Sequence, residues 1–146
     1  MEIINRKAKF DYEFVENYTA GVMLKGTEIK SIRNGSVSFT DSFCIFLEDG
    51  LWLRNVHISE YDQGNINNHE PKRDRKLLLT KQELNKLHSK VKEKGLTIVP
   101  TKIFINDKNL AKVNIALCKG KKLWDKRETI KERDLTREMN YTSDKD

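Results

Sequence analysis

The lysine and arginine side chains of this sequence gather in two segments. Nine lie between residues 69 and 94 against four acidic side chains, and eight lie between residues 119 and 137 against four. The second segment also holds a tryptophan, Trp124. Fixed cations bind phosphate groups, and an exposed indole among cations can stack on a nucleic-acid base. The pattern therefore indicates non-covalent binding of a polyanion, either a nucleic acid or an anionic membrane surface.

Each of these features has a structural alternative. The run from Lys72 to Lys76 places four basic side chains around one aspartate, which suits phosphate binding but is equally typical of a solvated charged face. Trp124 can stack on a base or fold back onto the protein core. Trp52 alternates with the aliphatic residues Leu51 and Leu53, so we expect it to be buried in the core.

The residue types that perform catalysis are present but not grouped. The histidines His57, His69 and His88 lack the spacing of metal ligands. The sequence has no carboxylate pair, no glycine-rich phosphate loop and no Gly-x-Ser-x-Gly motif of a serine nucleophile. We therefore expect a protein that is not an enzyme, with no catalytic residue, no metal and no cofactor. His57 is expected at the surface or in a structural role, and His88 in helix packing.

Composition narrows the class of protein further. The 146 residues have a net charge of +6 and a pI near 9.3, with 37% apolar and 34% charged residues, which favours one compact domain and a segment outside its core. Cys44 and Cys118 lie far apart without a pairing motif, so we expect buried, reduced thiols. Residues 1–7 lack the apolar stretch of a signal peptide, and no run of about 18 apolar residues occurs, so we expect a cytoplasmic protein.

The elements that must position the basic residues begin with strands. Aromatic residues alternate with polar ones from residue 10 to residue 25, which predicts a strand, and Gly21 indicates a bulge or a sharp bend in it. Residues 27–33 predict a short helix. The dipeptide Asp49-Gly50 lies between two apolar runs and predicts a β-hairpin.

The second half of the chain predicts one firm helix between a loop and two strands. Residues 62–76 are polar, and we expect an exposed loop. A Thr-x-x-Glu capping box and a regular apolar face predict a helix over residues 80–94. Strands are expected at about 96–105 and 110–118, the second with its aliphatic side chains on one face.

These elements predict a mainly β protein with about three helices. Several short strands with a helix between two of them suggest a small antiparallel β-barrel, closed or partly closed, of the oligonucleotide-binding type. We expect this domain to span residues 1–118. Residues 119–146 have too few apolar side chains to pack on it, so we expect a basic tail that is disordered when free and helical on a polyanion.

The order of several motifs resembles that of the SsrA-binding protein (small protein B) family. The motifs are Asn5-Arg6-Lys7-Ala8, Ala20-Gly21, Gly26-Thr27-Glu28-Ile29-Lys30-Ser31-Ile32-Arg33, Arg75-Lys76-Leu77-Leu78-Leu79 and Lys119-Gly120-Lys121-Lys122 with Asp125-Lys126-Arg127. Each motif alone is weak. Together, in the same order and spacing over about residues 5 to 137, they are highly specific.

The resemblance implies an oligonucleotide-binding barrel that acts as a monomer, one per RNA molecule, in the rescue of stalled ribosomes. Its partners would be the tRNA-like domain of transfer-messenger RNA and the ribosome. The RNA-binding residues it implies are Asn5, Arg6, Lys7, Thr19, Lys76, Leu79, Lys81 and Lys112. The tail would enter the empty mRNA channel and reach the decoding centre through Lys119, Gly120, Lys121, Lys122, Trp124, Asp125, Lys126, Arg127, Lys131, Arg133 and Arg137.

Two positions depart from the family pattern. Many relatives have a glutamate where this chain has Thr19, and some have an asparagine-like residue where it has Lys81.

The residues also leave other functions open. A generic ribosomal or translation-factor RNA-binding module would share the barrel and the charge without a separate tail, and a nuclease would require divalent metal.

Overall fold

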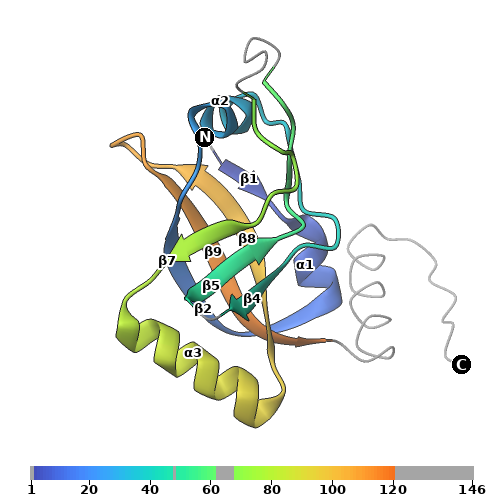
Figure 1. The fold of residues 1–146 in the computed structure, drawn as a ribbon. Coiled ribbons are helices and arrows are strands. Elements are labelled where there is room, and N and C mark those ends of the chain that lie inside the picture. Colours follow the sequence, from blue (N-terminus) through green and yellow to red (C-terminus); the bar gives the residue numbers. More distant parts are fainter. Residues whose placement is uncertain (1, 48, 62–67, 121–146) are drawn as a thin grey trace, which may run out of the picture.

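Strand pairing closes the main sheet on itself. In the computed structural model, which describes residues 2–47, 49–61 and 68–120, the strand order is β1-β8-β4-β5-β7-β2-β9, and β9 also pairs with β8. The elements are β1 (Glu2–Ile4), α1 (Arg6–Asp11), β2 (Tyr12–Val22), α2 (Gly26–Arg33), β3 (Val37–Ser38), β4 (Phe43–Leu47), β5 (Gly50–Arg54), β6 (His57–Ile58), β7 (Arg75–Leu78), α3 (Lys81–Lys94), β8 (Thr97–Ile105) and β9 (Ala111–Gly120). Six strands from β8 round to β9 thus form a closed ring, and β1 pairs with the second half of β8. The described residues confirm a mainly β protein with three helices (Figure 1).

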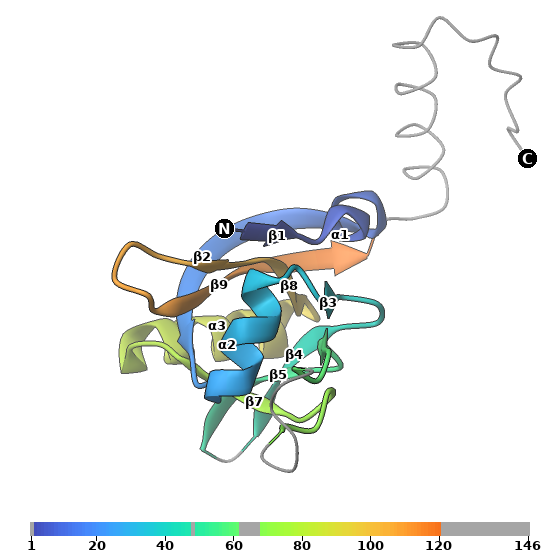
Figure 2. The same ribbon diagram turned by 90° about the horizontal axis from the view of Figure 1, so that it is seen from above.

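The interior of the ring is filled because the strands alternate apolar and polar side chains. In β9, Val113, Ile115 and Leu117 are fully buried in the main core, as the sequence predicted. Helices cover both ends of the ring, with α2 across one end and α3 across the other (Figure 1, Figure 2). Ile32 of α2 and Leu87 of α3 join the same core. No helix among the described residues is long and apolar enough to cross a membrane.

The two cysteines are free and buried, as predicted. Cys44 belongs to the main core, whereas Cys118 packs with Ala8 and Val99 in a smaller core beneath α1. Burial raises the pKa of both thiols, that of Cys118 to about 12. Both side chains therefore remain protonated at neutral pH and act as small apolar groups.

The longest strand, β2, changes partners along its length. It pairs first with β9 and then, at its end, with β7, so that Gly21 lies between Lys112 and Leu78. The register between β2 and β9 shifts between Phe14 and Glu16 and not at Gly21, so the bulge, one of the two alternatives predicted for Gly21, lies elsewhere in the strand. A Cβ atom at Gly21 would lie 3.3 Å from Cβ of Leu78, which explains the glycine by close strand approach instead.

The β4–β5 hairpin confirms the turn predicted at Asp49-Gly50, but the prediction for Trp52 was wrong. Leu51 and Leu53 are buried, and the two-residue period of the strand places Trp52 on the outer face. The indole Nε1 donates a hydrogen bond to Asp49 Oδ1 at 2.9 Å. Trp52 therefore lies on the outer face of the hairpin, where it bonds to the turn, and is not part of the core.

Helix α3 begins and ends as the sequence predicted. Thr80 Oγ1 accepts a hydrogen bond from the backbone of Glu83 at 3.1 Å, and Gly95 ends the helix with a φ of 63°. Lys90 of α3 forms an ion pair with Glu16 of β2. Hydrogen bonds from Lys90 and then Tyr18 lower the pKa of Glu16 to about 2. The ion pair holds α3 against β2.

A buried carboxylate joins α2 to the segment before β7. Glu28 and Arg75 are both fully buried, and Arg75 Nε donates to Glu28 Oε2 at 2.6 Å. Arg73 Nη2 donates to Glu28 Oε1, also at 2.6 Å, and the backbone N–H of Lys25 donates to the same oxygen at 2.7 Å. Burial alone would raise the pKa of Glu28, but the hydrogen bonds from Arg73 and Lys25 and the charge of Arg75 lower it below its ordinary value.

These contacts correct the prediction of an exposed loop over residues 62–76 as far as residues 68–76 are concerned, and residues 62–67 lie outside the described part of the chain. His69 and Arg75 are buried, and Arg73 is paired, so the run from Lys72 to Lys76 is not a free cationic surface. The prediction was wrong because a count of the charged residues does not reveal that Arg73 and Arg75 pair with the buried Glu28. The ring of His69 also links Thr27 Oγ1 of α2 to the carbonyl oxygen of Ile58, each at 2.8 Å.

Candidate nucleic-acid interface

A groove of about 760 Å³ lies between the N-terminal segment and strands β2, β8 and β9. It is lined by Glu2, Ile4, Asn5, Arg6, Lys9, Phe14, Asn17, Thr101, Lys102 and Asn114. Asn5 and Arg6 belong to the RNA-binding set that the sequence predicted. Most of the lining is polar or basic, which suits a phosphate-containing ligand more than an apolar one.

Asn5 positions the groove through the main chain of β8. Its side-chain amide donates to the carbonyl oxygen of Pro100, and its backbone N–H donates to that of Thr101, both at 2.8 Å. These two bonds fix the start of α1, a six-residue helix that the sequence analysis did not predict. The helix buries Ala8 and directs Arg6 and Lys9 to the groove.

The outward faces of β2 and β9 extend this surface. Thr19 pairs across the sheet with Asn114, and Thr19 Oγ1 donates to Asn114 Oδ1 at 2.9 Å. Lys112 lies two residues along β9, next to Gly21. Of the predicted residues, Asn5 and Arg6 therefore line the groove, and Thr19 and Lys112 lie on the adjoining outer faces of β2 and β9. Lys7 is exposed on α1 but is not part of the groove lining.

The two leucines that follow Lys76 have different environments. Leu78 is 51% exposed and points outward beside Gly21, on the same side of the sheet as Lys112. Leu79, the leucine predicted to contact RNA, is half-buried and packs against the main core. The alternation along β7, with Arg75 and Leu77 inward, distinguishes Leu78 from Leu79. The resemblance implied Leu79, and the burial of the two side chains adds Leu78 as the more exposed of the two.

Lys76 lies within β7 and Lys81 at the start of α3, and both lie near the β4–β5 hairpin. Lys76 Nζ is 3.6 Å from Asp49 Oδ2, which compensates its charge in part. Lys81 is exposed at the start of α3 and lines a hollow of about 770 Å³ between that helix and the hairpin. This hollow shares no lining residue with the groove. The predicted RNA-binding residues Lys76 and Lys81 therefore lie apart from those at the groove.

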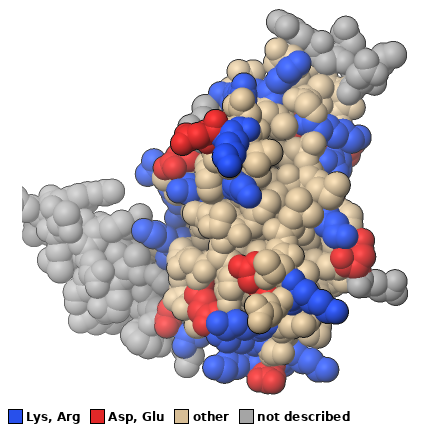
Figure 3. All heavy atoms as spheres, turned by 90° about the vertical axis from the view of Figure 1, so that its left-hand side faces the viewer, with Lys and Arg blue, Asp and Glu red and all other residues tan. Residues whose placement is uncertain are grey.

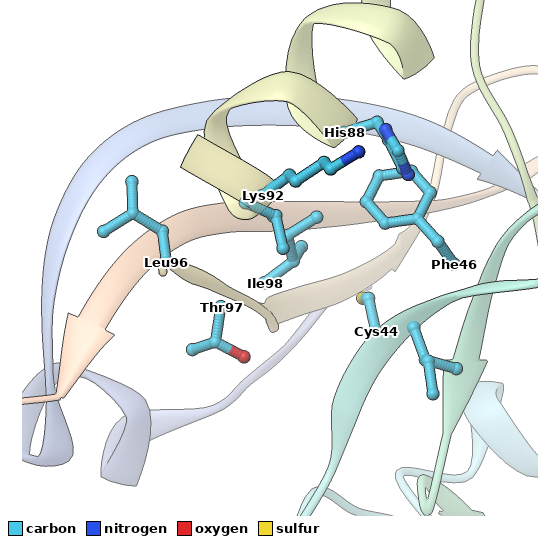
Figure 4. Close-up of a pocket in the computed structure, with 9 residues that line it drawn as sticks. Cys44, Phe46, His88, Lys92, Leu96, Thr97 and Ile98 are labelled. Carbon is cyan, nitrogen blue, oxygen red and sulfur yellow. The ribbon is translucent and has the colours of Figure 1, made fainter. Parts of the chain in front are cut away.

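A smaller hollow of about 290 Å³ adjoins the one beside Lys81 (Figure 4). The ring of His88 meets Phe46 edge-on with centroids 5.0 Å apart, which agrees with the packing role expected for His88. Cys44 and Ile98 line the same space, and Lys92 lies at its rim. The side chains that meet here are mainly apolar and come from β4, β8 and α3, so the hollow is a packing gap at the end of the ring.

The charged side chains also differ between the groove and the region around α3. Within the described residues, the groove has Arg6, Lys9 and Lys102 against Glu2, which forms an ion pair with Lys102 at 3.2 Å. A second group of lysines lies along α3 with acidic side chains among them. Figure 3 shows this group in the lower part of the molecule, below a largely uncharged band. Arg6 and Lys9 have no ion-pair partner among residues 2–47, 49–61 and 68–120, so they are available to phosphate groups.

The predicted tail begins within the sheet. Strand β9 continues to Gly120, which pairs with Tyr12, and Lys119 Nζ is 3.8 Å from Glu13 Oε2. Lys119 and Gly120 are therefore structured. The remaining tail residues of the predicted set lie outside the described part of the chain: Lys121, Lys122, Trp124, Asp125, Lys126, Arg127, Lys131, Arg133 and Arg137. Among the residues that are described, no group of three or more His, Cys, Asp or Glu side chains is placed to hold a metal ion.

Comparisons with known proteins agree with the motif order. The family model described as SmpB protein matches residues 2–145. An SsrA-binding protein of Phocaeicola vulgatus is 55% identical over 140 residues, which are 96% of this chain and 93% of that protein. One of Thermosipho africanus is 51% identical over 136 residues, with 93% and 91% covered. A chain in a solved structure described as "tmRNA-SmpB: a journey to the center of the bacterial ribosome" matches with a TM-score of 0.71 and 46% identity, covering 97% of this chain and 99% of that one.

Leu78 and Leu79 should respond differently to truncation. We expect Leu79→Ala to lower the free energy of unfolding by about 2–3 kcal/mol, because it removes packing from the core. Leu78→Ala should change it by less than about 1 kcal/mol but weaken nucleic-acid binding, because its side chain is exposed on the groove side. Urea denaturation and a binding titration measure the two effects. If Leu79→Ala impaired binding without loss of stability, the choice of Leu78 would be wrong.

Proposed function

The chain belongs to the SmpB protein family, and we propose that it binds the tRNA-like domain of transfer-messenger RNA and delivers it to stalled ribosomes for trans-translation. The observation that carries this proposal is the match over nearly the whole chain to proteins named SsrA-binding. The related solved structure, whose description joins tmRNA, SmpB and the ribosome, supports the same partners. A mainly polar and basic groove, whose lining includes Asn5 and Arg6 of the predicted set, also supports an RNA ligand.

The proposed RNA-binding surface combines three kinds of side chain. Arg6, Lys9 and Lys112 would bind phosphates, whose contribution to affinity does not depend on sequence. Thr19 and Asn114 offer neutral hydrogen-bonding groups between them. Leu78 would contact a ribose or a base edge through its exposed apolar side chain. This mixture is typical of surfaces that bind structured RNA by shape, backbone and sugar contacts.

The strand topology supports a more specific fold class. We assign the closed ring of short antiparallel strands to the oligonucleotide-binding barrels, in which a helix covers one end of the ring. In this chain α3 lies between β7 and β8 in sequence and covers that end. We also propose that the protein is a cytoplasmic binding protein rather than an enzyme, because its partners are RNA and the ribosome.

The basic tail would act on the ribosome rather than in RNA capture. We propose that it enters the empty mRNA channel and reaches the decoding centre, where its cations contact ribosomal RNA and Trp124 stacks on a base. The barrel and the tail would then meet different partners.

Neutralising the groove should weaken RNA binding without unfolding the protein. We expect the double variant Arg6→Gln, Lys112→Gln to bind the tRNA-like fragment at least about tenfold more weakly and to show a smaller salt dependence. The wild-type protein, with about six phosphates neutralised, should lose roughly a thousandfold in affinity between 50 and 200 mM salt. Filter binding at several salt concentrations measures both effects.

The matched control for this experiment is Lys92→Gln, Lys94→Gln on α3, which removes the same charge from the other basic surface. It should bind nearly as well as the wild-type protein at each salt concentration. If the control weakened binding as much as the groove variant, affinity would depend on overall charge. In that case the groove would not be the RNA-binding site.

The tail should be dispensable for RNA binding and required on the ribosome. We expect a chain that ends at Gly120 and the variant Trp124→Ala to retain affinity for free transfer-messenger RNA, because neither changes the groove. Both should lose most tag addition on stalled ribosomes in a reconstituted translation assay. Trp52→Phe is the control, since Trp52 lies on the outer face of the barrel. Loss of RNA binding by Trp124→Ala would place the tail in RNA capture and contradict the division.

A further inference from the structure

We propose that Thr19 and Asn114 together bind one ribose 2′-hydroxyl group of the RNA, so that this pair distinguishes RNA from DNA at the edge of the groove. The inference rests on the RNA-binding function proposed above and names the chemical group that the site recognises. Asn114 was not among the residues that the sequence predicted. It lines the groove and is half-buried there.

The hydrogen bond within the pair determines what each side chain can still offer. A threonine hydroxyl has one hydrogen and two lone pairs, and an asparagine amide has two N–H groups and a carbonyl oxygen. Thr19 Oγ1 donates its hydrogen to Asn114 Oδ1 at 2.9 Å. Thr19 can therefore only accept from a ligand. Asn114, whose oxygen faces Thr19, offers the ligand its two N–H groups.

An acceptor beside a pair of donors matches a hydroxyl group. The ribose 2′-hydroxyl donates one hydrogen bond and accepts others, so it can donate to Thr19 Oγ1 and accept from Asn114 Nδ2. A phosphate group offers only acceptors and would leave the Thr19 lone pairs unsatisfied. A deoxyribose offers neither group at this position. The pair is thus complementary to RNA in a way that the surrounding cations are not.

The main chain holds the pair in place. Thr19 and Asn114 are register partners on adjacent strands, and Thr101 Oγ1 donates to the backbone oxygen of Asn114 at 3.1 Å. Asn114 is also the register partner of Lys102 on β8. Arg6 and Lys9 line the same groove. Phosphates bound by these cations would bring the intervening sugar to the neutral pair.

The test uses the tRNA-like fragment of the chain's own transfer-messenger RNA, with single 2′-deoxy substitutions placed in turn along it. At fixed salt we expect one position at which the wild-type protein loses roughly 5- to 10-fold in affinity. Thr19→Val and Asn114→Leu should bind the all-ribose fragment weaker by a similar factor. Neither variant should lose further affinity at that 2′-deoxy position, because the contact is already absent.

Two further variants make the outcome specific. Thr19→Ser retains the hydroxyl and should restore both the affinity and the 2′-deoxy penalty. Thr97→Val, which removes a threonine hydroxyl from the hollow beside α3, should behave as the wild-type protein does. Melting curves of the two Thr19 variants should be unchanged, since Thr19 is exposed.

Each remaining result would overturn the inference in a distinguishable way. If no 2′-deoxy substitution weakened the wild-type protein, or if the penalty persisted in Thr19→Val and Asn114→Leu, the pair would not bind a 2′-hydroxyl although RNA binding would stand. If the wild-type protein bound the fragment no more tightly than an unrelated RNA hairpin of equal length, the proposed function would fail and the inference with it.

Discussion

The buried carboxylate of Glu28 is the interaction on which the arrangement of the other elements depends. A lone charge in the core would be very unfavourable, so Glu28 requires the guanidinium groups of Arg73 and Arg75 that surround it. Arg75 in turn donates to the carbonyl oxygens of Val56 and Pro71, at 2.7 and 2.9 Å. One cluster thus joins α2, the segment after β5 and the start of β7. It sets which face of β7 points outward.

That orientation connects the core to the proposed RNA-binding surface. With Arg75 pointing inward, the two-residue period of β7 directs Leu78 outward beside Gly21, which lies two residues from Thr19 on β2. Ring closure by β9 then brings Lys112 to the same side of the sheet. The groove therefore draws on segments from both halves of the chain, which only the closed sheet places together. Within these family motifs, Glu28 and Arg75 themselves are buried and serve this placement.

The sequence predicted what local patterns determine. The capping box at Thr80, the hairpin at Asp49-Gly50 and the alternation in β9 depend on neighbouring residues, and all three are confirmed. Trp52 and the charged run before β7 were misjudged because their environment depends on strands that are distant in sequence. Residue type alone predicts a buried tryptophan and an exposed arginine. Arg75 is buried instead, because it pairs with the buried carboxylate of Glu28. Of the predicted RNA-binding residues, the structure unites those on β2, β9 and the N-terminal segment, a grouping that no sequence spacing reveals.

The most direct test of the account is the free energy of unfolding of wild-type protein and Glu28→Gln as a function of pH. At neutral pH the variant should be less stable by about 3–5 kcal/mol, since it leaves buried Arg75 without its counter-charge. The pKa of Glu28 is lowered in the folded state, so its contribution is complete above the ordinary carboxyl pKa of 4.5 and is lost as the pH falls below it. The difference between the two proteins should therefore narrow in acid, because other carboxylates are common to both. A difference that is near zero at neutral pH, or that does not change below pH 4.5, would contradict the organising role of this cluster.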